Sequence, residues 1–372
     1  MELEIAYLYD AVYPWVKGGA EKRIYELSQR MARRGHTVHC YGMKWWQGEN
    51  DIQIDGVRLH GICQPMPLYS GGKRSMKEAA YFAGKVLSAG VECEIVDCQN
   101  FPYLSCFSAK LRTCVKRRDL FITWHEVWGE YWYEYMGRKG AFGKYIEKAA
   151  ARLTDKNIAV SERTRRDLER LGAKSVQVVP NGIDWQKIER IIPSEKQSDI
   201  ICAGRLVRHK NVDLLIQALS MVKSEIPDVR ALVIGDGPEN SALKSLVRER
   251  GLENNVEFCG FLENYSDALA LMKSSRVFAS PSTREGFGMA ALEANACGLP
   301  VVTVRHRMNA VMDLVTKETG MVCEPTAEAL AKSLCRALPK GDDMRGQCIE
   351  MARKYDWDEI CERAERVYEN GK

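Results

Sequence analysis

Short apolar runs recur along the first half of the chain, and segments with helical periodicity separate most of them. The runs cover residues 3–9, 36–41, 57–62, 93–97, 120–124, 157–160 and 176–179. Short β-branched runs that alternate with helices are typical of a largely parallel sheet that is buried on both faces. The pattern therefore predicts a doubly wound α/β domain.

The same alternation restarts in the second half, after a turn cluster at 180–184 and a polar stretch at 185–198 that we interpret as a hinge. The strands expected there cover residues 199–204, 230–235, 256–260, 277–280, 300–304 and 320–323. A chain of 372 residues exceeds the usual size of a single core. We therefore expect two Rossmann-like doubly wound parallel-sheet domains facing across a cleft: residues 1–187 and 188–354. A C-terminal helix, residues 355–372, is expected to pack back on the first domain.

Charge is spread unevenly although the net charge is only +4. Residues 1–190 hold 30 Lys and Arg against 23 Asp and Glu, which gives +7; residues 191–372 hold 24 against 27, which gives −3. The basic half includes residues 110–118, on a predicted helix that could face acidic lipid headgroups or simply be solvated. We favour solvation, because charges on helix surfaces are common.

The composition favours a cytoplasmic protein with reduced thiols. No stretch approaches the roughly 20 apolar residues of a membrane span, and residues 1–5 lack the features of a signal peptide. The 13 cysteines form no Cys-x-x-Cys pair, and most lie in apolar runs. An odd count without a secretion signal favours buried thiols over disulfides or zinc.

The stretch from Glu285 to Glu293 carries the strongest candidate chemistry. A buried strand ends at Pro281, and a helix is expected from near Gly288 to Gly298. Glu285 then lies in the loop, and Glu293 lies about two turns along the helix. Free N–H groups at the helix start favour anions, so the stretch suits a ligand with both hydroxyls and phosphate. The alternative is a glycine-rich turn with two solvated charges.

Two further loops follow predicted strand ends of the same domain. Gly204-Arg-Leu-Val-Arg-His-Lys210 offers Arg205 and Lys210, whose side chains suit phosphate oxygens. Ile234-Gly-Asp-Gly-Pro238 allows close backbone approach to a ligand but is not a Gly-x-Gly-x-x-Gly motif. An NAD site is therefore weakly supported. In such sheets, ligands bind in the crevice beyond the carboxyl ends of the strands.

Taken together, these motifs resemble the retaining, GT-B-fold enzymes of glycosyltransferase family 4. The resemblance rests on their order and spacing over nearly the whole chain. The matching pieces are Gly18-Gly-Ala-Glu21, Arg34-Gly-His-Thr-Val38, Val160-Ser161, Val179-Pro-Asn-Gly-Ile-Asp184, Gly204-Arg-Leu with Lys210, Val233-Ile-Gly-Asp-Gly-Pro238, Phe258-Cys-Gly-Phe261 and the stretch from Pro281 to Pro300.

The resemblance implies a role for each candidate residue toward a nucleoside diphosphate sugar. Glu293 would hold the ribose hydroxyls, and Glu285 would bond hydroxyls of the donor sugar. Arg205 and Lys210 would neutralise the diphosphate and stabilise the charge that builds on the leaving group. Other residues expected to bind substrate are Gly18, Gly19, Gly235, Gly260, Phe261, Gly286, Phe287, Gly288 and Met289. The Gly18–Gly19 loop would close over the phosphates.

His125 follows the strand at 120–124, where the family places a histidine against the donor sugar. The family has Asp after it, whereas this chain has Glu126. We assign His125 to sugar positioning and charge stabilisation rather than nucleophilic attack. Asp356-x-Asp358 resembles a metal motif, but acidic residues at a helix start usually cap it. We therefore expect no metal and no cofactor.

Two features remain open at this point. Aromatic residues crowd residues 124–135, where they could bind acceptor, contact a membrane or simply pack. Residues 305–309 read Arg-His-Arg-Met-Asn, where the family often has a Gly-Gly pair followed by Glu. That departure leaves the shape of the local loop in doubt.

The predicted function is transfer of a sugar from a UDP or GDP sugar to a sugar, glycan or lipid-linked acceptor, with retention. The alternatives are a nucleotide-sugar epimerase and a non-catalytic nucleotide-sugar-binding protein. We expect a cytoplasmic enzyme that contacts the inner face of the cell membrane peripherally, and no nucleic-acid partner, because net charge is small.

Overall fold

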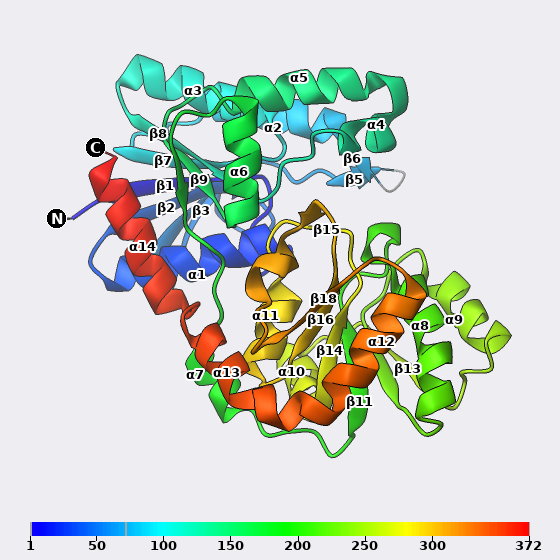
Figure 1. Cartoon of the computed structure of the whole chain (residues 1–372). Helices are drawn as coiled ribbons and strands as arrows, with labels where there is room; N and C mark the ends of the chain where they lie inside the picture. The colour runs from blue at the N-terminus through cyan, green and yellow to red at the C-terminus, as the bar shows by residue number, and fades with distance from the viewer. Residues whose placement is uncertain (1, 71–72, 372) are drawn as a thin grey trace. The chain divides into compact units, whose positions relative to one another are not determined.

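A computed structural model describes residues 2–70 and 73–371 (Figure 1). Contacts divide the chain into two compact units. One comprises the chain up to Asn181 together with the chain from Trp357 onward, and the other is Gly182–Asp356. Both contain a mostly parallel sheet with helices, as the hydrophobic pattern predicts, and each is described here by itself.

The sheet of the first unit has the strand order β10-β9-β8-β7-β1-β2-β4-β3. Its strands are β1 (Glu4–Leu8), β2 (Thr37–Met43), β3 (Asp51–Ile54), β4 (Val57–Cys63), β7 (Ile95–Gln99), β8 (Asp119–Trp124), β9 (Asn157–Ala159) and β10 (Val176–Val178). Neighbours pair in parallel except β3, which runs antiparallel to β4. The sequence pattern missed β3, because its alternating exposure reflects an edge strand with few apolar residues.

The helices of this unit are α1 (Gly19–Arg33), α2 (Met76–Ser88), α3 (Leu104–Lys116), α4 (Tyr131–Met136), α5 (Gly140–Ala150), α6 (Glu162–Leu171) and α14 (Trp357–Asn370). A small hairpin, β5 (Tyr69–Ser70) and β6 (Lys73–Arg74), precedes α2, and a 3-10 turn, η1 (Gly137–Lys139), joins α4 to α5. The C-terminal helix α14 packs against α1 and buries Trp357, Ile360 and Tyr368.

The sheet of the second unit has the order β13-β12-β11-β14-β16-β18. Its strands are β11 (Ser198–Ala203), β12 (Ala231–Ile234), β13 (Val256–Gly260), β14 (Ser275–Ser280), β16 (Val301–Val304) and β18 (Gly320–Cys323). A separate short ladder joins β15 (Arg284–Glu285) to β17 (Met308–Asn309). All six predicted strands are present, because their apolar runs are buried on both faces of the sheet.

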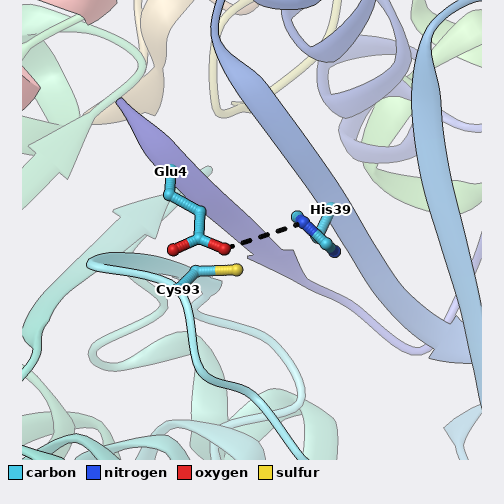
Figure 2. A group of neighbouring side chains, drawn as sticks. All are labelled: Glu4, His39 and Cys93. Carbon is cyan, nitrogen blue, oxygen red and sulfur yellow. Dashed lines mark ion pairs between the residues drawn. The ribbon is translucent and has the colours of Figure 1, made fainter. Parts of the chain in front are cut away.

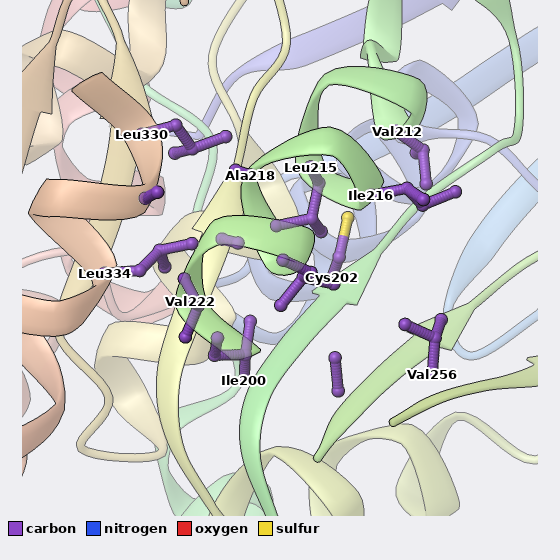
Figure 3. Packing of buried hydrophobic residues seen from close by; sticks show 14 of the residues in the cluster. Ile200, Cys202, Val212, Leu215, Ile216, Ala218, Val222, Val256, Leu330 and Leu334 are labelled. Atoms are coloured by element: carbon purple, nitrogen blue, oxygen red, sulfur yellow. The ribbon is translucent and has the colours of Figure 1, made fainter. Parts of the chain in front are cut away.

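The helical segments of this unit are α7 (Trp185–Arg190), η2 (Arg208–Lys210), α8 (Val212–Glu225), α9 (Asn240–Glu249), α10 (Tyr265–Lys273), α11 (Met289–Ala296), η3 (Ala310–Leu314), α12 (Ala327–Ala337), η4 (Leu338–Lys340) and α13 (Gly341–Arg353). Figure 3 shows Leu215 and Val222 of α8 packed over Ile200 and Cys202 of β11. The stretch that we interpreted as a hinge contains α7, whose N-cap Asp184 accepts a hydrogen bond from the Lys187 N–H at 3.0 Å.

No helix in the described ranges combines the length and the apolar composition that a bilayer crossing requires. All 13 cysteines are free, and most of them are buried, as the sequence predicts.

Candidate active site

Glycine residues stand at the ends of three neighbouring strands of the second unit, where they let the backbones approach closely. The Gly204 N–H donates to the Ile234 carbonyl at 3.0 Å, and the Gly235 N–H donates to the Gly260 carbonyl at 2.8 Å. A Cβ atom on Gly235 would collide with the Gly204 carbonyl oxygen, and Gly235 has a φ of 124°. Only glycine fits there. The loops after β11, β12 and β13 therefore start from one edge of the sheet, with Phe261 exposed beside Gly260.

Lys210 and Glu285, predicted on separate loops, are brought together. Lys210 Nζ lies 2.5 Å from Glu285 Oε1, and both side chains are partly exposed. The backbone holds this arrangement, because the Thr283 N–H donates to the His209 carbonyl at 3.0 Å. Asn211 Nδ2 also donates to the Pro281 carbonyl, at 3.1 Å. Hydrogen bonds thus join the loop after β11 to the loop after β14. Together the two loops carry a cation and an anion whose side chains are partly exposed.

The loop after β11 is strongly cationic. Burial, together with the cations Arg284, Lys210 and Arg205, lowers the pKa of His209 to about 4. His209 is therefore neutral at physiological pH, while the Arg205 side chain is exposed and the Lys210 side chain is partly exposed. Such a loop suits a diphosphate.

The α11 helix begins where the sequence predicts. Gly288 is its N-cap residue, with a φ of 98°, and its carbonyl accepts from the Leu292 N–H at 3.1 Å. A Cβ atom there would collide with Val311. The Phe287 side chain is buried and packs on Tyr355 with a centroid distance of 5.9 Å. The side chain of Phe287 thus anchors the loop.

Residues 305–309, which depart from the family pattern, include a strand that pairs with the strand carrying Glu285. Asn309 in β17 lies opposite Glu285 in β15. The buried Asn309 amide donates to the Val304 carbonyl at 2.8 Å and accepts from the Val311 N–H at 3.1 Å. The loop therefore has a defined shape without the Gly-Gly pair, which sequence reasoning left in doubt.

Glu293 is buried in α11, in contrast to the partly exposed Glu285. Tyr265, at the start of α10, donates its hydroxyl to Glu293 Oε1. Lys187 lies over the Tyr265 ring, 5.7 Å from its centroid. Sequence reasoning missed Tyr265, because nothing in its own segment connects it to a carboxylate that follows 28 residues later.

In the first unit, a chain of hydrogen bonds orients His125. Gln99 Nε2 donates to Asp97 Oδ1 at 3.2 Å, which turns Gln99 Oε1 toward His125 Nε2 at 2.8 Å. Tyr368 of α14 donates to Asp97 Oδ2 at 2.6 Å. Because an amide oxygen only accepts, the proton of His125 is on Nε2, and Nδ1 keeps a lone pair.

His125 is also electrically neutral. Burial and, to a smaller extent, the nearby Arg23 lower its pKa to about 3. Arg23 itself is buried and donates from Nη1 to the Pro180 carbonyl at 2.5 Å. The imidazole can therefore accept a hydrogen bond at Nδ1 but does not carry a charge at physiological pH.

The aromatic residues at 124–135 mostly pack. Trp124, Trp128 and Trp132 are buried in the core of the first unit, whereas Tyr133 is exposed. Trp128 Nε1 donates to Glu126 Oε1 at 2.5 Å, so Glu126 fixes the aromatic segment beside His125. Packing thus accounts for the tryptophans, which the sequence left open.

The Gly18–Gly19 loop forms the start of α1. Gly18 is the N-cap residue in extended conformation, and its carbonyl accepts from the Lys22 N–H at 3.1 Å. Glu21 folds back against Gly18, where any Cβ would meet its carboxylate. Burial and, to a smaller extent, Asp10 raise the pKa of Glu21 to about 7.

Asp356 and Asp358 each have a protein partner. Asp356 Oδ2 accepts from the Trp185 N–H at 3.0 Å, and Asp358 Oδ1 accepts from Arg30 Nε at 2.7 Å. Neither belongs to a group of three metal-ligating side chains within the described residues.

Comparisons with known proteins identify the class. The family "Glycosyl transferases group 1" matches residues 184–355, and "Glycosyltransferase Family 4" matches residues 17–187. Similar solved structures include sucrose-phosphate synthase from Thermosynechococcus elongatus, with a TM-score of 0.79 and 21% identity over 98% of both chains. Another is the Anabaena protein HepE in complex with UDP and glucose, with a TM-score of 0.75 and 21% identity over 99% of this chain and 100% of that one.

Similar relatives are named as glycosyltransferases. A phosphatidylinositol N-acetylglucosaminyltransferase subunit from Arabidopsis thaliana is 24% identical over 95% of this chain and 78% of its own length. The GDP-mannose-dependent alpha-(1-6)-phosphatidylinositol dimannoside mannosyltransferase of Mycobacterium tuberculosis is 25% identical over 58% of each chain. The chain belongs to the GT-B glycosyltransferases of group 1 and family 4. It is thus a transferase, as predicted.

Proposed function

We propose that this glycosyltransferase moves a sugar from a nucleoside diphosphate sugar to a lipid-linked acceptor, with retention and without a metal. The observation that carries the proposal is the Lys210–Glu285 pair, at 2.5 Å, at the mouth of α11. A cation for the diphosphate and a carboxylate for sugar hydroxyls, side by side, suit a donor that carries both groups. The nucleotide base can be uridine or guanosine.

In the reaction, the bond between the anomeric carbon and the diphosphate oxygen breaks, and the electron pair leaves with the nucleoside diphosphate. Arg205 and Lys210 stabilise this charge, a role in which preorganised cations contribute several kcal/mol. The acceptor hydroxyl oxygen bonds to the anomeric carbon on the face that the diphosphate leaves, and its proton passes to the departing phosphate oxygen. Fixed cations can replace a metal in this scheme.

Each remaining candidate has a role in positioning the donor. Glu293 binds the ribose hydroxyls while Tyr265 holds its carboxylate. Glu285 and the backbone N–H groups of residues 287–289 bind sugar hydroxyls and phosphate. His125 accepts a hydrogen bond from a sugar hydroxyl at Nδ1, and the Gly18–Gly19 backbone meets the phosphates.

An apolar cavity in the first unit supports a lipid-linked acceptor. It measures about 130 Å³, similar to an engineered cavity of about 150 Å³ that takes up benzene. Its apolar lining includes Met76, Ala79, Phe101, Leu104, Phe142 and Ile146. Phe142 is 60% exposed, and the exposed cations Lys77, Arg138 and Lys139 flank the lining residues in sequence. An acyl chain beside a phosphate headgroup matches this combination.

The names of the relatives support the same acceptor class, because several act on phosphatidylinositol or its mannosides. In this proposal the enzyme works in the cytoplasm, held peripherally at the inner face of the cell membrane. The basic end of α3 contributes less than the sequence allows, because Lys116 pairs with Glu92 at 3.7 Å.

Radiolabelled UDP and GDP sugars, supplied with phosphatidylinositol vesicles, test the proposal. We expect label in an organic-extractable lipid product with at least one donor. The proposal fails if label moves only into water-soluble glycans when both kinds of acceptor are present, or if free epimerised nucleotide-sugar is the product.

A further inference from the structure

Three neighbouring strands of the first unit bring together a carboxylate, an imidazole and a thiol. The strands lie in the order β7-β1-β2. Glu4 begins β1, His39 lies in β2, and Cys93 precedes β7. Their ligand atoms all lie within 4.8 Å of one another, and Figure 2 shows the Cys93 sulfur and the Glu4 carboxylate directed toward the His39 ring. Such a set can hold a metal ion.

The strand register explains why Glu4 and His39 meet. His39 is the register partner of Ala6, and Ala6 lies two residues beyond Glu4 in β1. Residues two apart in a strand share a face, so Glu4 and His39 are on the same face of the sheet. The spacing of Glu4, His39 and Cys93 in the sequence gives no sign of this, because they come from three segments far apart along the chain.

A second observation points to a ligand at this position. Asp51 Oδ1 lies 3.0 Å from His60 Nδ1, and His60 Nε2 lies 2.8 Å from His39 Nδ1. With both rings neutral, as metal binding requires, a proton on His60 Nδ1 faces the Asp51 carboxylate, and His39 donates from its own Nδ1 to His60 Nε2. His39 Nε2 then presents a bare lone pair.

That lone pair is buried. His39 is only 8% exposed, and its Nε2 atom has no hydrogen-bond partner among the described residues. The nearest charged group is Glu4, at 4.0 Å, which is itself an acceptor when ionised. Two lone pairs that face each other in a buried position repel. This repulsion costs free energy unless a proton or a metal ion lies between them.

We propose that Glu4, His39 and Cys93 bind a divalent transition metal of the zinc class, with water as the fourth ligand. Thiolate and imidazole ligands select zinc over magnesium or calcium. On binding, Cys93 releases its thiol proton to solvent as the metal–sulfur bond forms. A histidine that donates its second ring N–H toward a carboxylate, here through His60, is the usual outer shell of such a site.

The site needs only a small adjustment to close. Ligand atoms around tetrahedral zinc are on the order of 3.5 Å apart, given bonds of about 2.0–2.3 Å. The Glu4 side chain is 44% exposed and free to rotate toward the ion, while His39 and Cys93 are buried. The ion would join three adjacent strands and stabilise the sheet.

This site is separate from the chemistry proposed above. Glu4 lies at the amino end of β1, whereas His125 follows the carboxyl end of β8 in the same sheet. The sequence favoured thiols over zinc because the cysteines lack paired spacing, and Cys93 is the exception to that expectation. The inference is independent of the acceptor and the donor.

Titration of the chelator-treated full-length protein with Co²⁺ tests the site. We expect one equivalent to give visible bands of tetrahedral cobalt and a near-ultraviolet thiolate-to-cobalt band, both lost on addition of Zn²⁺. The Cys93→Ser variant should lose the thiolate band, whereas Cys114→Ser, at an exposed cysteine in α3, should keep it. Absence of stoichiometric binding by the wild-type protein overturns the proposal, as does a thiolate band that survives Cys93→Ser.

Two substitutions away from the buried cysteine test the site in case Cys93→Ser does not fold. Glu4→Gln should weaken Co²⁺ affinity at least about tenfold, and Asp51→Asn should weaken it by roughly 10–100-fold through His60. Unchanged affinity in both would remove these residues from the site. Zn²⁺ should raise the melting temperature of the wild-type protein but not that of Cys93→Ser. Because every readout is binding or stability, failure here leaves the transferase proposal intact.

Discussion

Lys210 Nζ lies 2.5 Å from Glu285 Oε1, so the loop after β11 and the loop before α11 share one ion pair. The donor phosphates and the donor sugar are then bound by adjacent groups of opposite charge. In the proposed reaction Lys210 meets the leaving group, and Glu285 orients both Lys210 and the sugar hydroxyls. We therefore expect replacement of Lys210 and replacement of Glu285 to affect donor binding and turnover differently.

Replacing Lys210 with Met should lower kcat by about 10²–10³-fold, because a preorganised charge on the leaving group is lost. Lys317→Met removes an exposed lysine elsewhere in the same unit and should leave kcat unchanged. Steady-state rates on both variants check this. An equal kcat in Lys210→Met and wild type would remove Lys210 from the reaction.

Glu293 and Glu285 should separate nucleotide binding from sugar recognition. Glu293→Ala should weaken the bare nucleoside diphosphate, while Glu285→Ala should spare it and reduce turnover. Tyr265→Phe removes one hydrogen bond to the Glu293 carboxylate and should cost about 1–2 kcal/mol of nucleotide affinity. Calorimetry with UDP and GDP measures the nucleotide affinity of all three variants. Equal losses of nucleotide affinity in Glu293→Ala and Glu285→Ala would contradict this division of roles between the two glutamates.

The sequence was sufficient to predict both sheets, because their strands are apolar runs separated by helices. It also placed Glu285 before the helix and Glu293 within it, from the positions of Pro281 and Gly298 alone. The structure confirms Glu293 in α11, whereas Glu285 lies in the short strand β15 rather than in a loop, because its backbone pairs with β17.

Contacts between distant segments could not be predicted in this way. The Lys210–Glu285 distance depends on the Thr283–His209 backbone bond, and the Tyr265–Glu293 bond depends on how α10 packs beside α11. The orientation of His125 depends on Gln99 and Asp97, whose side chains meet only because β7 and β8 are neighbours. Edge strand β3 was missed because it has too few apolar residues to register as a strand.

His125 should act as a neutral hydrogen-bond acceptor. His125→Ala should lower kcat by about a hundredfold. Because its pKa is about 3, the plot of kcat against pH should show no His125 ionisation near the usual value of 6.5. Nitrogen NMR of the wild type should show the Nε2–H tautomer.

Gln99→Leu removes the acceptor that fixes this tautomer, so it should change the His125 NMR signal and lower kcat while leaving nucleotide affinity unchanged. Gln53→Leu, at an exposed glutamine in the edge strand β3, is the control for loss of an amide away from His125. A wild-type imidazole with its proton on Nδ1 would contradict the assignment.

Glu21 should make the protein less stable as pH rises. Its folded-state pKa of about 7 exceeds the usual 4.5, so the unfolded chain releases this proton first. Stability is therefore fully present below about pH 4.5 and is lost as pH rises through 7. Glu21→Gln avoids this loss and should be more stable than wild type at pH 8 by up to about 3 kcal/mol, with a much smaller gain at pH 5.

Urea unfolding at the two pH values measures the Glu21 effect. The exposed Glu49→Gln change is the control, and its difference from wild type should not grow with pH. A Glu21→Gln gain that is the same at pH 5 and pH 8 would show that the carboxyl is not held protonated by burial.

The most direct test of the account is the anomeric configuration of the transferred sugar, measured by proton NMR on product made in excess EDTA. We predict transfer at the full rate, with the configuration of the donor retained, because Arg205 and Lys210 supply the charge that a metal would otherwise provide. An inverted product, or activity that EDTA abolishes and Mn²⁺ restores, would contradict it.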